Sequence, residues 1–364
     1  MGCLRLFLAV CVVSGHAGPL FGLTLPSSNS AVLLFFIISG FYMTLICTGK
    51  YAHDRAGVTL FYENRLLRLF PGYLLVLALS VLFPLIFVGG DFPGYSAIEN
   101  SFDGAGLPAQ FLCIVSNLTM VCSDAALFIN LGPSNGQFVP LGAAGAPAAS
   151  GPLAHSFLCV PQIWTVGVEL LFYITAPFVV HHFRLVMVLL SASLLLRLGL
   201  ANCGFEYEPW GYRFLPSLYW FFMTGAALCH GYMAWRAKDR GFLNPANLAL
   251  IGLALIAMAL MDIFSNGYVL ASRYLLYALP VPFIFHFTRN LHWDRMIGDL
   301  SYPVYINHVL VFQASVYFLD MSLFDRGVVI TFLSVALAGF MVFLIEHPVD
   351  RYRQRLARGR GAAA

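Results

Sequence analysis

Charged residues are scarce in this chain. Asp, Glu, Lys and Arg make up only 10% of its 364 residues, whereas hydrophobic residues make up 60% and the mean hydropathy is +0.80. Soluble domains usually carry about 25% charged residues, so this composition excludes a soluble globular protein and indicates an integral membrane protein. The formal net charge is only +3. We expect the chain to be surrounded by a lipid bilayer and to have no nucleic-acid partner.

Two kinds of sequence pattern are also missing. No cysteines have Cys-x-x-Cys spacing and no His-Glu-x-x-His run occurs, so the sequence predicts no metal site. No internal repeat is evident, and this absence counts against transporters that are built from inverted repeats.

Ten apolar stretches, each close to twenty residues long, have the length that a helix needs to cross a bilayer. Helices satisfy every backbone polar group within lipid, so the predicted fold class is an all-α integral membrane protein with a bundle of about ten transmembrane helices. The predicted spans are residues 5–23, 31–49, 69–90, 161–181, 184–201, 213–234, 245–263, 272–288, 299–319 and 326–346.

Lysine and arginine are unevenly distributed around these spans. Sixteen of the 20 fall on one side, and this positive-inside asymmetry predicts that both termini are cytoplasmic. Residues 1–350 then form a single membrane domain, followed by a basic cytoplasmic tail over 351–364. The inner residues are Arg5, Lys50, Arg55, Arg65, Arg68, Arg184, Arg236, Lys238, Arg240, Arg289, Arg295, Arg351, Arg353, Arg355, Arg358 and Arg360. Four arginines fall at outer ends of spans, where the first three could line a polar cavity: Arg197, Arg213, Arg273 and Arg326.

Residues 91–160 contain no Lys or Arg, and a span there would invert every later loop. We therefore predict an outer loop with an interfacial or re-entrant helix within residues 107–131. Loops of this length are usually functional, and this one is expected to help form a lid or groove for an external ligand; a flexible cover is the alternative. Four cysteines on the predicted outer side could form one or two disulfides, with the pairing left open: Cys113, Cys122, Cys159 and Cys203.

Arg5 and His16 lie eleven residues apart in the first apolar stretch. On a helix this spacing places both side chains on one face, about 16 Å apart along the axis, which is close to half of a bilayer core. The sequence predicts an imidazole near the membrane midplane, above a guanidinium at the inner entrance. An ionisable residue at that depth indicates function; a hydrogen-bonded core histidine is the structural alternative.

Three other polar groups accompany predicted spans. Arg65 and Arg68 face the same way on a helix and can grip a phosphate, or they can anchor the third span on its inner side. Glu169 lies inside an apolar span, where burial of a carboxylate is costly unless it pairs with a cation or joins two helices. His308 lies in a later span, with Tyr and Asn residues nearby.

These residues stand in motifs that resemble, in order and over almost the whole chain, the integral-membrane acyltransferases of acyltransferase family 3. Singly the motifs are loose, but together with ten predicted spans they are specific. The matching elements are Arg5-x10-His16, Phe36-Ile37-Ile38-Ser39-Gly40-Phe41, Arg65-x-x-Arg68 before Phe70-Pro71, Trp164-x4-Glu169-x-x-Phe172-Tyr173, and Ser301-Tyr302-x-x-Tyr305-x-x-His308.

The resemblance implies an enzyme that O-acylates polysaccharides or other extracytoplasmic glycans from a cytoplasmic acyl-CoA. It implies His16 as the catalytic base, supported by Arg5, and it places Arg65 and Arg68 on the acyl-CoA side. Glu169 is expected to position an acceptor hydroxyl or to tune a cation.

The same resemblance leads us to expect substrate contacts from Trp164, Tyr173 and His308. Acetyl-CoA is the expected co-substrate and no metal is expected. The outer-side glycan is the expected acceptor, and the expected location is the plasma (inner) membrane. Homo-oligomerisation stays open.

Alternatives remain at this point. The acyl group could pass directly from the thioester to the hydroxyl, or through an acyl-histidine intermediate. A transporter or flippase for a glycan or a lipid-linked substrate could use the same buried charges along a translocation path. A non-enzymatic membrane receptor would not need the buried His, Arg and Glu residues.

Overall fold

The computed structural model describes residues 1–51, 54–87, 107–131, 138–140, 158–205, 209–236, 277–319 and 325–359. Helices form nearly all of the regular structure in these ranges, which confirms the all-α class. One short antiparallel hairpin joins β1 (Ile129–Leu131) to β2 (Phe138–Pro140), with Asn130 opposite Val139.

The helices that begin before residue 200 are α1 (Gly2–Ala17), α2 (Ser28–Gly49), α3 (Arg55–Phe87), α5 (Leu107–Thr119), α6 (Trp164–Val179) and α7 (Phe183–Asn202). Those that follow are α8 (Leu215–Arg236), α11 (Val281–Thr288), α12 (His292–Asp299), α13 (Ser301–Phe318), α14 (Arg326–Met341) and α15 (His347–Gly359). Three short segments complete the set: the 3-10 turns η1 (Ala125–Phe128) and η3 (Pro161–Ile163), and the π-helical segment η4 (Val342–Glu346).

Several of these helices are apolar enough to lie in a bilayer, and the chain is a membrane protein. Five helical segments within the described ranges have both the length and the composition to cross. They are Ser28–Gly49, Arg55–Ile86, Pro161–Val179, Phe183–Asn202 and Arg326–Leu356. The predicted span 245–263 and residues 272–276 of the next one lie outside the described residues. The full set of ten spans and their orientation therefore stay predictions.

Three predicted spans differ in length from the helices that the structure shows. In the described part of the span predicted over 272–288, α11 begins only at Val281, after a turn at residues 279–280. Helix α1 ends at Ala17 and not at residue 23, because Gly18 adopts a positive φ of 113° and Pro19 follows it. Helix α3 begins at Arg55 and not at residue 69, so its 33 residues extend for about 50 Å. That length exceeds a bilayer core of about 30 Å, and the extra turns carry Arg65 and Arg68.

Helix α2 lies at the centre of the bundle and packs closely on α8. A Cβ atom at Gly40 would lie 1.9 Å from the carbonyl oxygen of Phe222, and one at Gly225 would lie 1.9 Å from that of Ile37. The two backbones are therefore in direct contact, as in other membrane helix pairs with small residues at the interface. Ser193 of α7 completes this side, because its Oγ accepts a 2.9 Å hydrogen bond from the backbone N–H of Trp220 in α8.

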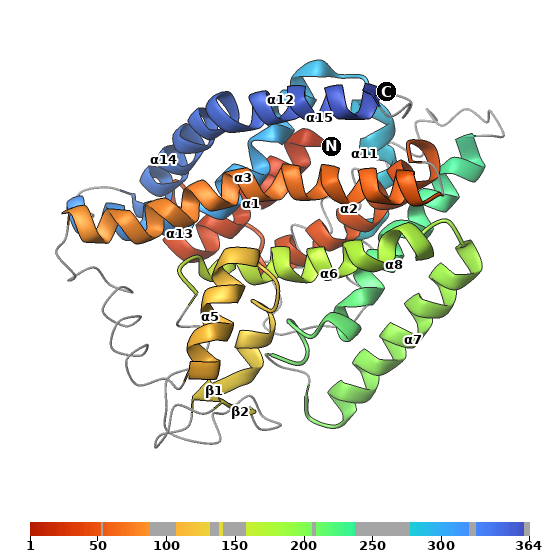
Figure 1. Cartoon of the computed structure of the whole chain (residues 1–364), viewed down its shortest axis with the longest axis horizontal. Helices are drawn as coiled ribbons and strands as arrows, with labels where there is room; N and C mark the ends of the chain where they lie inside the picture. Colours follow the sequence, from red (N-terminus) through yellow and green to blue (C-terminus); the bar gives the residue numbers. More distant parts are fainter. Residues whose placement is uncertain are drawn as a thin grey trace.

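Helix α1 runs between the late helices α12, α13 and α14. At its start, Gly2 lies against the backbone of α12, where a Cβ would clash with Asp294 and Gly298. Beyond its end, the carbonyl groups of Gly18 and Pro19 lie against Gly327 of α14. The start of α1 and helix α15 lie together at the top of Figure 1, whereas α5 and the hairpin lie at the bottom.

Candidate active site

A cavity of about 490 Å³ opens between α1, α2, α3, α6, α12, α13, η4 and α15. Its lining is unusually rich in charge for this chain, and every arginine in it belongs to the set that the sequence places on the inner side. We call it the arginine cavity. Its arginines are Arg5, Arg65, Arg68, Arg289, Arg295 and Arg353, and its acidic residues are Glu169, Asp294, Asp299, Glu346 and Asp350.

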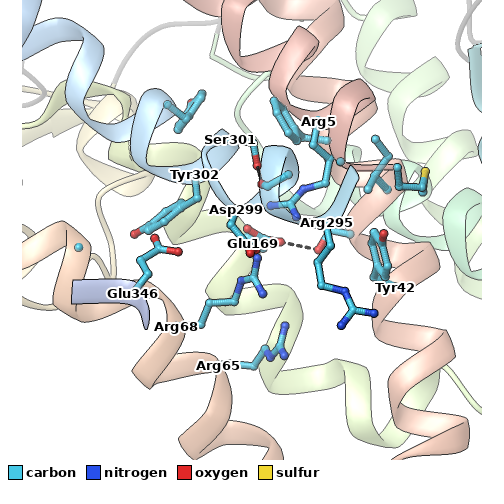
Figure 2. Close-up of a pocket in the computed structure, with 18 of the residues that line it drawn as sticks. Arg5, Tyr42, Arg65, Arg68, Glu169, Arg295, Asp299, Ser301, Tyr302 and Glu346 are labelled. Atoms are coloured by element: carbon cyan, nitrogen blue, oxygen red, sulfur yellow. Dashed lines mark hydrogen bonds between the residues drawn. The ribbon is translucent and has the colours of Figure 1, made fainter. Parts of the chain in front are cut away.

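The arginines of this cavity converge from different helices. In Figure 2, Arg5 of α1 points into the cavity from one side, and Arg65 and Arg68 of α3 point into it from the opposite side. The guanidinium of Arg65 lies 5.8 Å from the ring centre of Phe61 and 6.0 Å from that of Tyr173, and its Nε is buried without a hydrogen-bond partner among the described residues.

The carboxylates do not neutralise these arginines pairwise. Within the described ranges, the guanidinium groups of Arg5, Arg65 and Arg68 have no carboxylate oxygen within 4.0 Å, whereas Arg353 pairs with Asp350 at 3.1 Å. Guanidinium groups bind phosphate with paired, charge-assisted hydrogen bonds. The arrangement is therefore suited to a ligand that carries several negative charges.

Glu169 is held in the cavity wall by two hydroxyl groups. Ser39 Oγ donates a 2.5 Å hydrogen bond to Glu169 Oε1, and Tyr173 Oη donates a 2.6 Å hydrogen bond to the same oxygen. Glu169 itself is half-buried and lines the cavity. Two of the sequence motifs therefore meet at one carboxylate, which leaves Oε2 without a hydrogen bond from any described residue.

The motif on α13 connects the cavity with the interior of the bundle. Tyr302 Oη donates a 2.7 Å hydrogen bond to the Leu69 carbonyl of α3, and the Tyr305 hydroxyl lies 2.8 Å from Thr165 Oγ1 of α6. Tyr302, Tyr305 and Thr165 all line the cavity. The two tyrosines thus fix α13 against α3 and α6.

His308 and His16 lie beyond Tyr305. The His308 ring centre is 5.9 Å from that of Tyr305 and 5.2 Å from that of His16. His308 is completely buried, and its Nδ1 lies 2.6 Å from the Tyr305 carbonyl oxygen. A carbonyl can only accept, so Nδ1 carries a proton, and in the neutral imidazole the lone pair then lies on the buried Nε2 of His308.

His16 lies near the end of α1, where this helix meets the starts of α2 and α14. Its neighbour Gly15 packs against Ser28, the first residue of α2, and Gly18 packs against Gly327, the second residue of α14. The imidazole of His16 is exposed, whereas Arg5 at the other end of α1 lines the arginine cavity. The spacing of Arg5 and His16 on α1 is the predicted one, and the midplane position of His16 stays a prediction.

The sequence-predicted residues therefore divide into two groups. Arg5, Arg65, Arg68, Glu169 and Tyr173 come together in the arginine cavity. The other three, His16, His308 and Trp164, do not line it. Trp164 is buried, with the Arg213 guanidinium 4.3 Å from its ring centre.

Sequence reasoning missed several lining residues. Arg295 and Arg353 carried only the positive-inside signal, which does not separate a ligand-binding arginine from an anchoring one. Asp299 and Thr165 lie inside or next to the motifs, but nothing in their spacing shows that they face the cavity.

An ionic contact fixes the helix that carries Arg5. Asp294 of α12 accepts hydrogen bonds from the Met1 ammonium at 2.7 Å and from the N–H groups of Gly2 at 2.7 Å and Cys3 at 2.9 Å. Burial acts to raise the pKa of Asp294, but these donors outweigh it and hold the pKa well below its usual range. The carboxylate therefore stays charged and ties the start of α1 to α12.

The remaining chemistry-bearing residues are less organised. In the described ranges, no group of three or more His, Cys, Asp or Glu residues could hold a metal ion. All eight cysteines are free thiols, including the four on the predicted outer side for which disulfides were left open: Cys113, Cys122, Cys159 and Cys203.

Comparison with known proteins identifies the class. The model of acyltransferase family 3, described as an acyltransferase domain, matches residues 1–345, so the chain belongs to this family of membrane acyltransferases. Nodulation protein 10 of Rhizobium leguminosarum bv. viciae is 25% identical over 400 residues, which cover 99% of this chain and 95% of that protein. An uncharacterized protein of Aquifex aeolicus (strain VF5) is 21% identical over 204 residues, or 55% of this chain and 91% of that protein. No solved structure gives a significant match.

Proposed function

We propose that this acyltransferase moves an acyl group, acetyl in the first instance, from cytoplasmic acyl-CoA to a hydroxyl of an extracytoplasmic glycan or polysaccharide precursor. The observation that carries the proposal is the arginine cavity, with its six arginines in a chain of family 3. The proposed location is the plasma (inner) membrane, with the cavity open to the cytoplasm.

The donor half of the proposal rests on charge. CoA carries several phosphate groups, and Arg5, Arg65 and Arg68 offer guanidinium groups that no described carboxylate neutralises within 4.0 Å. Their attraction for phosphates is strong in a partly buried site. We assign the phosphates to this cavity, with Glu169 on its wall.

The acceptor half rests on the position of His16. Its imidazole is exposed at the opposite end of α1 from Arg5, so an outer hydroxyl can reach it. The line from the cavity through Tyr305 and His308 to His16 gives the route that we assign to the thioester end of the donor. His308 holds one fixed tautomer beside His16 and supports its ring.

The proposed reaction involves two proton transfers, one to His16 and one from it. The acceptor oxygen attacks the thioester carbonyl carbon while His16 takes the hydroxyl proton, and a tetrahedral oxyanion forms. Its collapse breaks the carbon–sulfur bond, and the CoA thiolate takes the proton from His16. The products are the glycan ester and free CoA, with His16 restored to its neutral form.

Purified protein in lipid nanodiscs tests this function. We expect CoA release from acetyl-CoA to depend on an added glycan, and the acetyl ester to appear on that glycan by mass spectrometry. His16→Ala should lower kcat by about 10²–10⁴-fold, the usual contribution of a general base. His182→Ala, which removes an exposed imidazole at the start of α7, is the matched control and should keep wild-type activity.

Two results would contradict the proposal. If the His16→Ala protein folds and retains full acyl transfer, His16 is not the general base. CoA release that ignores the glycan, or movement of an unmodified glycan across the bilayer, would favour a hydrolase or a flippase.

A further inference from the structure

The chemistry at His16 requires positive charge that the arginine cavity does not supply. A tetrahedral intermediate carries a negative oxygen, and donors or cations aimed at that oxygen usually contribute the largest part of the catalysis. Arg5 and His16 are eleven residues apart on α1, which corresponds to an axial rise of about 16 Å. Arg5 faces the cavity and is therefore poorly placed for an oxyanion at His16.

Arg213 lies in the connection between α7 and α8, and its position is fixed by aromatic rings. Its guanidinium carbon lies 4.3 Å from the ring centre of Trp164 and 5.4 Å from that of Tyr212. A cation over an indole ring at this distance is held by the ring's electron density. The connection itself is fixed by Arg197, whose Nη1 donates a 2.5 Å hydrogen bond to the Gly211 carbonyl.

Arg213 belongs to the His16 end of the bundle. Trp164, which it covers, directly precedes Thr165, and the Thr165 hydroxyl meets the Tyr305 hydroxyl at 2.8 Å, one ring away from His308. Arg213 is thus connected to His16 through a continuous series of contacts that runs over Trp164 and Thr165 to Tyr305 and His308. Arg213 is half-buried, which strengthens its field relative to that of an arginine in water.

We propose that Arg213 stabilises the oxyanion that forms on the thioester carbonyl, and that Trp164 positions Arg213 and does not contact the substrate. This inference rests on the proposed function and assigns the electrophilic group of that reaction. As the acceptor oxygen attacks the carbonyl carbon, the electron pair of the C=O bond moves onto oxygen beside the guanidinium. It returns when the carbon–sulfur bond breaks and the CoA thiolate leaves.

Steady-state kinetics of two Arg213 variants test the inference. Arg213→Gln should lower kcat by about 10²–10³-fold, as expected for the loss of a group that stabilises an oxyanion, with KM for acetyl-CoA and for the glycan within about twofold of wild type. Arg213→Lys keeps the positive charge and should restore part of the lost kcat. Arg326→Gln removes an exposed arginine from the start of α14 and should behave as wild type.

Trp164→Phe separates positioning from substrate contact. It keeps an aromatic face under Arg213 but a weaker one, so kcat should fall less than in Arg213→Gln and KM for the glycan should not change. A large rise in KM for the glycan in Trp164→Phe would show that Trp164 contacts the substrate.

The outcomes separate this inference from the proposed function. An inactive wild-type protein, or an active His16→Ala protein, would contradict the proposed function itself. With wild type active and His16→Ala inactive, wild-type kcat in Arg213→Gln would overturn the role of Arg213 alone. So would a raised KM for the glycan with unchanged kcat, because that pattern describes substrate binding. If Arg213→Gln does not fold, by size-exclusion chromatography, Arg213→Lys decides: wild-type kcat together with an increased glycan KM overturns the proposal, and reduced kcat with unchanged KM supports it.

Discussion

The arginine cavity and the His16 end of the bundle differ in how many charged side chains they contain. The cavity gathers six arginines and five acidic residues from α1, α3, α6, α12, η4 and α15 and from the end of α11. The His16 end holds two imidazoles in ring contact and the aromatic-bound Arg213. Tyr305 lies between them, lining the cavity with one part of its surface and facing His308 with another.

This difference fits the two halves of a transfer reaction. A donor with several phosphates is retained by many cations, because each guanidinium adds a charge-assisted hydrogen bond. A general base must be neutral to accept a proton, and a crowd of arginines around it would oppose the imidazolium that then forms. Separation of the two regions along α1 allows both requirements to be met.

The largest effect that would sharpen this comparison is on donor binding. The double variant Arg65→Gln, Arg68→Gln should raise KM for acetyl-CoA by about 100-fold or more, because a hydrogen bond to a charged group contributes about 1.5–3 kcal/mol and each 1.4 kcal/mol is tenfold. Steady-state assays with acetyl-CoA and with acetyl-pantetheine, which lacks the nucleotide phosphates, measure this effect. The phosphate-free donor should react equally with wild type and variant.

Arg184→Gln is the control for that experiment, since Arg184 is an exposed arginine on the same predicted side of the membrane. A fall in kcat without a change in KM for acetyl-CoA would break the comparison. The cavity arginines would then act in the chemical step and not in holding the donor.

A smaller effect is expected at the boundary between the regions. Tyr305→Phe removes the hydroxyl that meets Thr165 Oγ1 at 2.8 Å and keeps the ring beside His308. The loss of about 0.5–1.5 kcal/mol should lower kcat by up to about tenfold, with little change in KM for acetyl-CoA. Thr165→Val removes the other hydroxyl and should give a similar value. If both variants mainly changed KM for acetyl-CoA and not kcat, the Tyr305 and Thr165 hydroxyl groups would belong to the donor site.

Substitution of Asp294 is expected to have the smallest effect on catalysis but a clear effect on stability. Its pKa is depressed in the folded protein, so its contribution is fully present above the ordinary carboxyl pKa of about 4 and is lost as pH falls toward the folded value. At pH 7, Asp294→Asn should therefore reduce the free energy of unfolding by about 1–3 kcal/mol and lower the thermal midpoint accordingly. The difference from wild type should shrink below about pH 4.

Thermal unfolding in detergent at the two pH values checks this prediction. Asp54→Asn is the comparison variant, because Asp54 is exposed and accepts a single 2.8 Å hydrogen bond from the Gly57 N–H. A pH-independent difference for Asp294→Asn would show that the carboxylate charge is not what secures α1.

Much of the helix pattern could be predicted from hydropathy, because each apolar stretch is a local property of the chain. Helices α2, α6, α7 and α8 begin and end close to the predicted spans. The heights of the helix ends could not be predicted, since they depend on packing. Gly15 against Ser28 places the end of α1 beside the start of α2, and no count of residues along α1 contains that contact.

The candidate site shows the same division. The motifs singled out both Arg68, for the acyl-CoA side, and Glu169, for the acceptor or a cation, and the structure places both in the lining of the arginine cavity. They did not show that Ser39 Oγ and Tyr173 Oη share one oxygen of Glu169, because this contact joins residues 130 positions apart. Positive-inside arginines such as Arg353 are indistinguishable in sequence whether they enter a cavity or face lipid headgroups.

The contact between Gly2 and Gly298 also sets an order of assembly. Of the helices that contact α1, α2 follows it directly in the chain, whereas α12, α13 and α14 are synthesised much later. Until residue 298 has been added, Arg5 has no α12 to hold it and the cavity lacks a wall. A nascent chain therefore cannot form the complete arginine cavity until α12 has been synthesised.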